Sequence, residues 1–233
     1  MSGYFITGTD TGAGKTFVTC ALMQALQARG LNVAPMKPVS AGTIDAGGVS
    51  INEDVALFMR LSANRFPLRA VNPCSLREAI APHIAARHDN VQIDLAEIQR
   101  AYRTLAAQAD MVLVEGAGGF LVPISDNESM ALIPAALQLP VIVVVGMRLG
   151  CINHTLLTVE AIRSRGLALA GWIANTTGAR MNAYAENLTT LNNAIDAPLL
   201  GEIPCIAEPD VAVASLAAAT HLTVDALVSR AAR

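Results

Sequence analysis

Residues 8–16, Gly-Thr-Asp-Thr-Gly-Ala-Gly-Lys-Thr, constrain this chain more than any other stretch. They follow the G-x-x-x-x-G-K-[ST] pattern with one additional residue between Gly8 and Gly14. The apolar run 4–6 precedes them, and apolar residues at helical spacing follow them until Gly30. The stretch is therefore expected to be a loop between a buried strand and an amphipathic helix, which is the context of a phosphate-binding site.

The chemistry of such a loop assigns roles to its residues. Glycines let successive backbone N–H groups face phosphate oxygens, and the helix that follows adds the positive end of its dipole. Lys15 would bring a charge to the outer phosphates, and the Thr16 hydroxyl would be a magnesium ligand. The alternative is a Gly-rich turn that carries an exposed lysine. The candidate nucleotide-binding residues here are Gly12, Ala13, Gly14, Lys15, Thr16 and Phe17.

The rest of the chain repeats the alternation of strand and helix. With 53% hydrophobic and 15% charged residues, the composition suits parallel strands that are buried on both faces. No linker or repeat divides residues 1–233. We therefore expect a single doubly wound α/β domain of the P-loop NTPase type, with a mainly parallel sheet and helices on both faces. Strands are expected at 4–6, 33–36, 111–114, 141–145, 169–174 and 198–203, and a last helix at 224–230.

Charge and hydropathy exclude several classes of partner. A net charge of −3 without a long basic run gives no footprint for nucleic acid. The longest apolar segment, 131–145, is broken by Pro134 and Pro140, so no membrane partner is expected. The first residues show no signal peptide, which predicts a cytoplasmic location. The four cysteines lack zinc-site spacing and are expected to be free thiols, mostly in the core.

Three charged residues stand at expected strand or helix ends. Lys37 follows the strand 33–36, and ligands of open α/β sheets bind outside the carboxyl ends of strands; it would lie beside the first loop if the two strands are neighbours. Asp54 lies in the first turn of a helix, and Glu115 ends the strand 111–114. The functional interpretation makes both acids magnesium ligands. The alternatives are a solvated lysine, a carboxylate that complements a helix dipole, and an exposed turn.

Other segments are less defined. The stretch 40–50 is expected to be a flexible loop, and 65–90 has no clear periodicity. The helix start near Gly150 offers free N–H groups for a carboxylate, although Asn153 could simply cap that helix. Asn175, at a strand end, could pair with an adenine edge. The motif Asn-Lys-x-Asp of guanine readers is absent at 175–178, which favours ATP over GTP.

The ordered set of these motifs resembles the dethiobiotin synthetase family over nearly the whole chain, to about position 206. The motifs that carry the resemblance are Gly-Thr-Asp-Thr at 8–11, Gly-Lys-Thr at 14–16, Lys-Pro-Val at 37–39, Asn-x-Asp at 52–54, Val-Asn-Pro at 71–73, Pro-His at 82–83, Val-Glu-Gly-Ala-Gly-Gly at 114–119, Val-Gly-x-x-Leu-Gly-Cys-Ile-Asn-His at 145–154 and Leu-Gly-Glu-Ile-Pro at 200–204.

The resemblance implies an ATP- and Mg²⁺-dependent reaction of biotin synthesis. The family converts 7,8-diaminopelargonic acid and CO₂ into dethiobiotin through a carbamate and a carbamic-phosphoric anhydride. It also implies a homodimer in which the second subunit receives the substrate's far carboxylate. The implied positions are Thr11, Lys15 and Lys37 for catalysis; Thr16, Asp54 and Glu115 for magnesium; Gly116, Ala117, Gly118, Asn175, Thr176, Pro204, Cys205 and Ile206 for the nucleotide; and Lys37, Ala41, Gly150, Cys151 and Asn153 for the substrate.

The chain departs from the family pattern at three of these positions. Gly12 and Thr176 stand where the family commonly has acids, and Ala41 replaces a serine that touches substrate, with Ser40 next to it. Two other functions share this fold class. A partitioning ATPase usually carries an extra lysine early in the loop, where this chain has Thr-Asp-Thr at 9–11. A cobyrinic-acid-type amidoligase usually carries a glutamine-hydrolysing domain, for which 233 residues leave no room.

Overall fold

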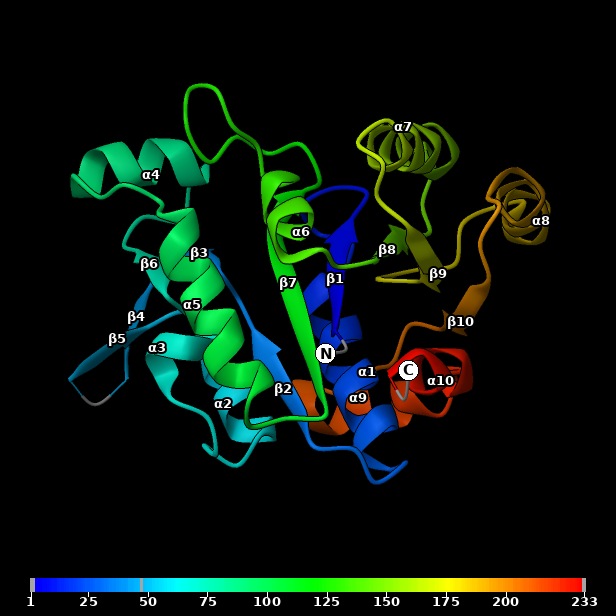
Figure 1. Cartoon of the computed structure of the whole chain (residues 1–233). Coiled ribbons are helices and arrows are strands. Elements are labelled where there is room, and N and C mark those ends of the chain that lie inside the picture. Colours follow the sequence, from blue (N-terminus) through cyan, green and yellow to red (C-terminus); the bar gives the residue numbers. More distant parts are fainter. Residues whose placement is uncertain (1–2, 47, 232–233) are drawn as a thin grey trace.

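The computed structural model describes residues 3–46 and 48–231, and its centre is a six-stranded parallel sheet. The strand order is β10-β9-β8-β1-β7-β2, and every pairing in it is parallel. The strands are β1 (Gly3–Gly8), β2 (Val33–Met36), β7 (Met111–Gly119), β8 (Val141–Gly146), β9 (Leu169–Asn175) and β10 (Leu199–Ile203). The expected strands and the doubly wound parallel fold are thus confirmed (Figure 1).

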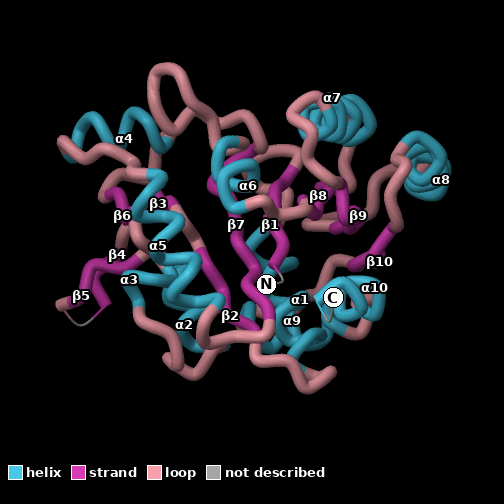
Figure 2. The backbone as a smooth tube through the Cα atoms, viewed as in Figure 1, coloured by secondary structure: helices cyan, strands magenta, loops and turns pink. Residues whose placement is uncertain are grey.

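Helices cover both faces of this sheet (Figure 2). In Figure 1, α5 and α6 lie in front of the sheet, whereas α1 and α9 lie behind it. The helices are α1 (Lys15–Gln27), α2 (Glu53–Leu61), α3 (Leu68–Val71), α4 (Pro82–Asp89), α5 (Leu95–Ala106), α6 (Leu132–Leu137), α7 (Cys151–Arg163), α8 (Tyr184–Ala194), α9 (Val211–Ala219) and α10 (Asp225–Ala231). None of the helices in the described part of the chain is long and apolar enough to cross a membrane.

The central strands are buried because both of their faces are covered. Every residue of β1 and β8 is buried, as expected for the β-branched run at 141–145. The helix α1 presents Val18, Leu22 and Leu26, each with no exposed surface, to this sheet. Parallel strands that end at the same edge place their polar carboxyl-terminal residues together, and this edge carries the site described below.

The strand order changes one expectation about Lys37. Strands β1 and β2 are not neighbours, because β7 lies between them and pairs with both. Strand β7 is also longer than expected, since it continues through the glycines to Gly119, which pairs with Gly8. Glu115 therefore lies inside the strand rather than at its end or in an exposed turn. Gly116 has no room for a side chain, because a Cβ there would clash with the Phe5 ring of β1.

Two segments that lacked a clear pattern contain short elements. Within 40–50, expected to be a loop, the chain forms β3 (Val39–Ala41) and the hairpin β4 (Ile44–Ala46) and β5 (Val49–Ile51); Gly47 lies outside the described residues. Within 65–90 it forms α3, β6 (Cys74–Leu76), which pairs in parallel with β3, and α4. Three-residue strands and a four-residue helix are too short to show periodicity.

The C-terminal segment adds two helices. Helix α10 was expected, but α9, Val-Ala-Val-Ala-Ser-Leu-Ala-Ala-Ala, was not. Its residues are nearly all apolar, so no polar face marks a helical period. Asp210 is its N-cap and accepts hydrogen bonds from the backbone N–H groups of Ala212 and Val213. Helix α9 packs along α1, which brings the C-terminal region to the first loop.

Candidate active site

The first loop joins β1 to α1 as its sequence predicts. Gly14 is in the left-handed region with φ of 82°, and a Cβ there would overlap the Asn175 amide nitrogen. Both observations explain why the position requires glycine. Lys15 is 8% exposed, and its Nζ donates to the Asp10 carbonyl at 3.3 Å. Burial lowers the pKa of Lys15 and the Lys37 charge lowers it further, while Glu115 opposes them.

Lys37 is held between two carboxylates. Its Nζ donates to Asp54 Oδ2 at 2.6 Å and to Glu115 Oε1 at 2.5 Å. The Lys37 side chain is 6% exposed and that of Glu115 is fully buried, whereas Asp54 is 36% exposed. Burial alone would lower the pKa of Lys37, but the two carboxylates outweigh it and raise the pKa above its usual value. Lys37 is therefore a buried ammonium and not a solvated strand tip.

Glu115 uses both of its oxygens. Oε1 accepts from the Thr16 hydroxyl at 2.9 Å as well as from Lys37, and Oε2 accepts from the Thr19 hydroxyl at 2.7 Å. Thr16 and Thr19 are three residues apart on α1, so their hydroxyls face β7 together. The three expected magnesium positions, Thr16, Asp54 and Glu115, thus meet around the Lys37 ammonium.

The donor set at this point suits a hard cation. It consists of one hydroxyl and two carboxylates, the oxygen ligands that Mg²⁺ prefers, and a positive group already lies among them. The described residues contain no group of three or more His, Cys, Asp or Glu side chains that could hold a metal ion by themselves. An ion here would need phosphate oxygens or water as further ligands, which is how Mg²⁺ commonly binds in nucleotide sites.

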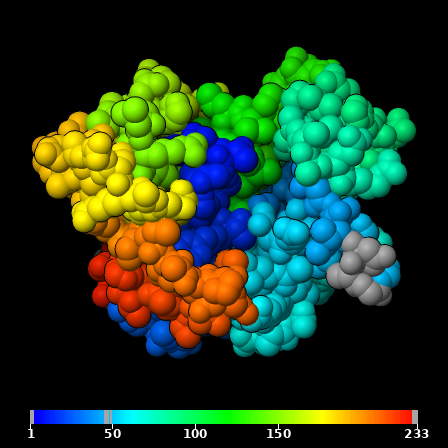
Figure 3. Space-filling view, turned by 180° about the vertical axis from the view of Figure 1, so that it is seen from behind, coloured from blue at the N-terminus to red at the C-terminus, as the bar shows by residue number. Residues whose placement is uncertain are grey.

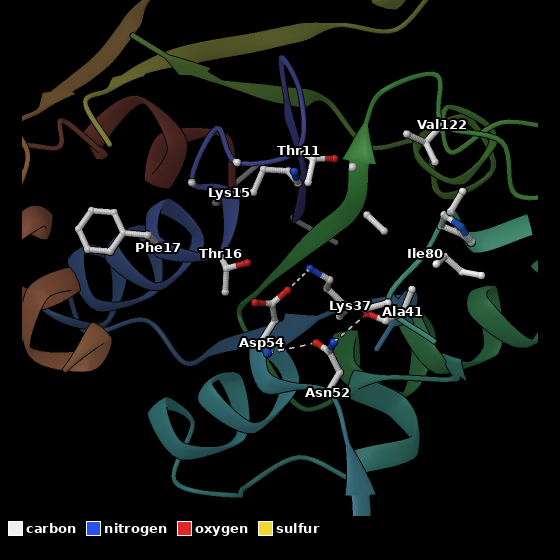
Figure 4. A pocket seen from close by; sticks show the side chains of 17 residues that line it. Thr11, Lys15, Thr16, Phe17, Lys37, Ala41, Asn52, Asp54, Ile80 and Val122 are labelled. Carbon is white, nitrogen blue, oxygen red and sulfur yellow. Dashed lines mark hydrogen bonds and ion pairs between the residues drawn. The ribbon is translucent and has the colours of Figure 1, made fainter. Parts of the chain in front are cut away.

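A cavity of about 640 Å³ opens over these groups (Figure 4). Lys15 and Thr16 line it from the first loop, while Lys37 and Asp54 point toward one another from the opposite side. The sequence-predicted residues that line it are Thr11, Gly12, Gly14, Lys15, Thr16, Phe17, Lys37, Ala41, Asp54, Ala117 and Gly118. Ala13 and Glu115 are buried beneath it. In Figure 3, the blue N-terminal segment reaches the surface between the orange C-terminal part and the cyan segment around α2.

Several lining residues were not predicted. Asn52, Ala79, Ile80, Ala81, Pro82 and Val122 complete the wall of this cavity. Asn52 caps α2 by accepting from the Asp54 N–H and donates to the carbonyls of Ala41 and Gly42, so it fixes Asp54 relative to β3. Asn52 and Pro82 belong to the family motifs Asn-x-Asp and Pro-His, which could have pointed to them. The order of residues alone does not show which side chains face a cavity.

The serine at position 40 does not replace the missing hydroxyl at position 41. Ser40 is fully buried, and its hydroxyl donates to the Asn72 side-chain oxygen at 3.0 Å. Asn72 in turn donates to the Lys37 carbonyl at 2.7 Å. Because side chains alternate along a strand, Ser40 faces the interior while Ala41 faces the cavity. The substrate side of this cavity is therefore apolar at position 41.

A second cavity of about 210 Å³ adjoins the first and shares Gly14 and Phe17 with it. The predicted base-binding residues Asn175, Thr176, Pro204, Cys205 and Ile206 all line it. The Asn175 amide nitrogen donates to the Ala13 carbonyl at 2.9 Å. Its Oδ1 is buried and has no hydrogen-bond partner among the residues that the structure describes. The Asn175 amide nitrogen is thus bonded to the first loop, and its oxygen remains able to accept a hydrogen bond from a ligand.

Gly150, Cys151 and Asn153 do not line either cavity. Gly150, with φ of 95°, is the N-cap of α7, and Asn153 is exposed inside the helix, so the interpretation of Asn153 as a cap is wrong. The start of α7 is nevertheless tied to the first loop, because the Arg148 guanidinium donates to Asp10 Oδ2. Leu149, which lies between Arg148 and Gly150 in the sequence, is 96% exposed.

Known proteins similar to this chain identify its family. A family model described as an AAA domain matches residues 2–211. The ATP-dependent dethiobiotin synthetase BioD of Aromatoleum aromaticum is 51% identical over 90% of this chain and 93% of its own length. The proteins of the same name from Nitrosospira multiformis and Ralstonia nicotianae are 48% and 44% identical, over 87% and 97% of this chain and 88% and 97% of theirs. The chain belongs to the dethiobiotin synthetase family.

Membership confirms the resemblance and makes this dethiobiotin synthetase family member an ATP-dependent ligase of the P-loop class. Solved structures with a similar fold come from other proteins. They include MinD of Pyrococcus horikoshii complexed with Mg-ADP (18% identity, TM-score 0.52, 98% of this chain and 92% of that chain) and a ParA family ATPase of Chlorobium tepidum (14%, 0.54, 100% and 99%). At these identities the likeness shows the fold alone.

Proposed function

We propose that this protein closes the ureido ring of dethiobiotin from 7,8-diaminopelargonic acid, CO₂ and ATP, releasing ADP and phosphate, in biotin synthesis. The observation that carries the proposal is that one cavity holds Lys15, from a phosphate-binding loop, together with Lys37, a buried ammonium from a different strand. A carbamate and a γ-phosphate are both anionic, so their reaction needs two positive groups at one place.

The reaction has three balanced steps. One amine of the substrate attacks CO₂ and loses a proton, which gives a carbamate. A carbamate oxygen then attacks the γ-phosphorus, and ADP leaves with the electrons of the bond that breaks. In the last step the second amine attacks the carbonyl carbon of the anhydride, loses a proton and expels phosphate. Lys37 and Thr11 orient the carbamate, and Lys15 neutralises the charge on the transferred phosphoryl group.

Mg²⁺ is the proposed cofactor, and Thr16, Asp54 and Glu115 would hold it. When bound, the ion would withdraw charge from the phosphate oxygens. The ammonium of Lys37 now pairs with both carboxylates, which leaves one negative charge for the ion to balance. We expect the ion to take over that role, which leaves Lys37 free to pair with the carbamate.

The nucleotide is proposed to span both cavities. Its phosphates would lie along residues 12–17, with Ala117 and Gly118 facing them from β7, whereas the predicted residue Gly116 is buried and does not line the cavity. Its base would enter the second cavity, where the unused Asn175 Oδ1 can accept from the adenine amino group. Thr176 and the segment Pro204 to Ile206 line the same cavity.

A homodimer is also proposed. Leu121, Leu149 and Leu157 are exposed by 48%, 96% and 57%, and a cavity of about 430 Å³ lies against Leu121 and Leu157. Leu121 and Leu157 line the same cavity, and exposed apolar side chains grouped in this way are typical of an interface. Since Gly150, Cys151 and Asn153 lie outside the cavity of their own chain, a two-fold partner could present them to the substrate carboxylate. The single-domain organisation and the cytoplasmic location remain predictions.

The test of the reaction is phosphate release from ATP, with the diamine or bicarbonate omitted in turn. We expect release only when both are present, with dethiobiotin formed in equal amount by mass spectrometry. Release that does not depend on the diamine would instead indicate a partitioning-type ATPase and overturn the proposal.

A further inference from the structure

We infer that Thr19 is a positioning residue for Glu115 and thereby for the magnesium site. The inference rests on the proposed function, because it assigns to Glu115 the role of a metal ligand. Thr19 lies on α1 one turn beyond Thr16, and both it and Glu115 have no exposed surface. No motif in the sequence marks Thr19, and it does not line the cavity.

The two oxygens of the Glu115 carboxylate have different hydrogen-bond partners. Oε2 accepts from Thr19 Oγ1 at 2.7 Å, while Oε1 faces Thr16 and Lys37 at 2.9 and 2.5 Å. A carboxylate held at one oxygen cannot rotate freely about its last torsion. The Thr19 hydroxyl therefore directs Oε1 toward the point where Thr16, Asp54 and Lys37 meet.

The hydroxyl has two possible acceptors, and their chemistry decides between them. Thr19 Oγ1 lies 2.9 Å from the Lys15 carbonyl and 2.7 Å from Glu115 Oε2. A hydroxyl has one proton to donate, and an ionised acceptor makes the stronger hydrogen bond. The bond to Glu115 is also the shorter one. Thr19 thus differs from Thr155, an equally buried threonine whose hydroxyl donates to the Cys151 carbonyl of its own helix.

Removal of the hydroxyl would leave a buried oxygen without a partner. In Thr19→Val the shape of the side chain is kept, but Oε2 of Glu115 loses its donor. The carboxylate can then regain a partner only by turning toward Thr16 and Lys37, which changes the oxygen that it offers to the ion. Removal of a hydrogen-bond partner of a metal ligand typically weakens metal affinity by about 10- to 100-fold.

The test compares Thr19→Val and Thr19→Ser with Thr155→Val as the control. Binding of Mn²⁺ to the ADP complex is followed by electron paramagnetic resonance, which needs no turnover, and the Mg²⁺ concentration for half-maximal activity is measured in parallel. We expect Thr19→Val to weaken Mn²⁺ binding by about 10-fold or more. Thr19→Ser keeps the hydroxyl and should remain within about 3-fold of the wild type. Thr155→Val should bind Mn²⁺ as the wild type does.

A double-mutant cycle separates positioning from general destabilisation. If Thr19 acts through Glu115, Thr19→Val should have little further effect on Mn²⁺ binding in a Glu115→Gln background. Unchanged Mn²⁺ affinity in folded Thr19→Val, or equal losses in both backgrounds, would overturn the inference. If Thr19→Val does not fold, Thr19→Ala provides the same comparison. A wild type that lacks diamine-dependent turnover but shows the Mn²⁺ effects would refute the proposed reaction and not the role of Thr19.

Discussion

The ammonium of Lys37 lies 2.5 Å from Glu115 Oε1; Lys37 directly follows β2, and Glu115 lies in the adjacent strand β7. The pair joins the residue proposed to bind the carbamate to one proposed to bind magnesium. Lys37 pairs with both Glu115 and Asp54, so a change at position 37 affects both the chemistry and the folded state.

We predict that Lys37→Met retains ATP binding but loses turnover. The methionine fills a similar volume without the charge, so kcat should fall by about 10²- to 10³-fold, as is typical when one group that stabilises a transition state is removed. Isothermal titration should find an ATP dissociation constant close to that of the wild type, because Lys15 and the loop are unchanged. Normal turnover in Lys37→Met would show that Lys37 does not serve the carbamate.

The raised pKa of Lys37 predicts how stability changes with pH. Burial opposes its charge, but Glu115 and Asp54 raise the pKa above the unfolded value of about 10.4. The stabilisation that comes from the charged lysine is therefore fully present below pH ~10.4 and is lost as the pH rises through the folded-state pKa. In urea unfolding, the difference in unfolding free energy between wild type and Lys37→Met should be nearly constant from neutral pH to about pH 10 and should shrink as the pH rises above ~10.4. A difference that does not depend on pH would contradict this assignment.

Gly14→Ala should be more damaging than Gly12→Ala. Both glycines have positive φ, 82° and 88°, so each substitution costs about 1–2 kcal/mol of backbone strain. A Cβ at Gly12 meets nothing within 4 Å, whereas at Gly14 it overlaps the Asn175 amide. Thermal unfolding should therefore show a lower Tm for Gly14→Ala, together with weaker ATP binding. Equal Tm values for the two variants would exclude a tight contact between Gly14 and Asn175.

Cys205 should be the cysteine that reacts first with a thiol reagent in the native protein. Cys20, Cys74 and Cys151 are buried, and burial raises the pKa of each, for Cys74 to about 11, while Cys205 is exposed. Since Cys205 lines the second cavity, ATP or ADP should slow its labelling. Labelling followed by peptide mass spectrometry checks both points. If the nucleotide gives no protection, the base does not bind where we propose.

Leu157→Arg should dissociate the proposed homodimer. Leu216→Arg is the matched control, because Leu216 is also on a helix and is 58% exposed, against 57% for Leu157. We expect monomers for Leu157→Arg and an unchanged mass for Leu216→Arg in sedimentation or light scattering. The monomers should bind ATP normally but the diamine poorly. A dimer that survives the change at Leu157 would place the interface elsewhere.

The parts of the structure that the sequence predicted are those with a local physical signal. The β-branched run that forms β8 and the glycine-rich loop before α1 were recognised because a buried strand and a phosphate-loop motif leave marks in neighbouring residues. That Lys15, Lys37 and Asp54 meet could be expected, since parallel strands end at one edge of a sheet. The family motifs supplied the roles, and spacing alone did not.

The features that the sequence did not predict depend on contacts between residues that are distant in the sequence. The position of Glu115 inside β7 follows from pairing of its glycines with β1, and the contact of Thr19 with Glu115 spans 96 positions. Ser40 and Ala41 show the same limit, because only the pairing of β3 with β6 decides which of them faces the cavity. Helix α9 was missed because a uniformly apolar segment carries no period.

The amino ends of the parallel strands lie at the opposite edge of the sheet from the candidate site. The turn between α1 and β2 lies at the amino ends of the strands, and an added Cβ at Gly30 would meet nothing within 4 Å. The φ of Gly30 is 83°, which strains any side chain there, so an insertion suits this turn better than a substitution. A dye attached there, or a short peptide inserted for surface immobilisation, would be separated from the nucleotide by the length of the sheet. The fold thus offers an attachment point for single-molecule measurements that leaves the candidate site at the carboxyl ends of the strands accessible.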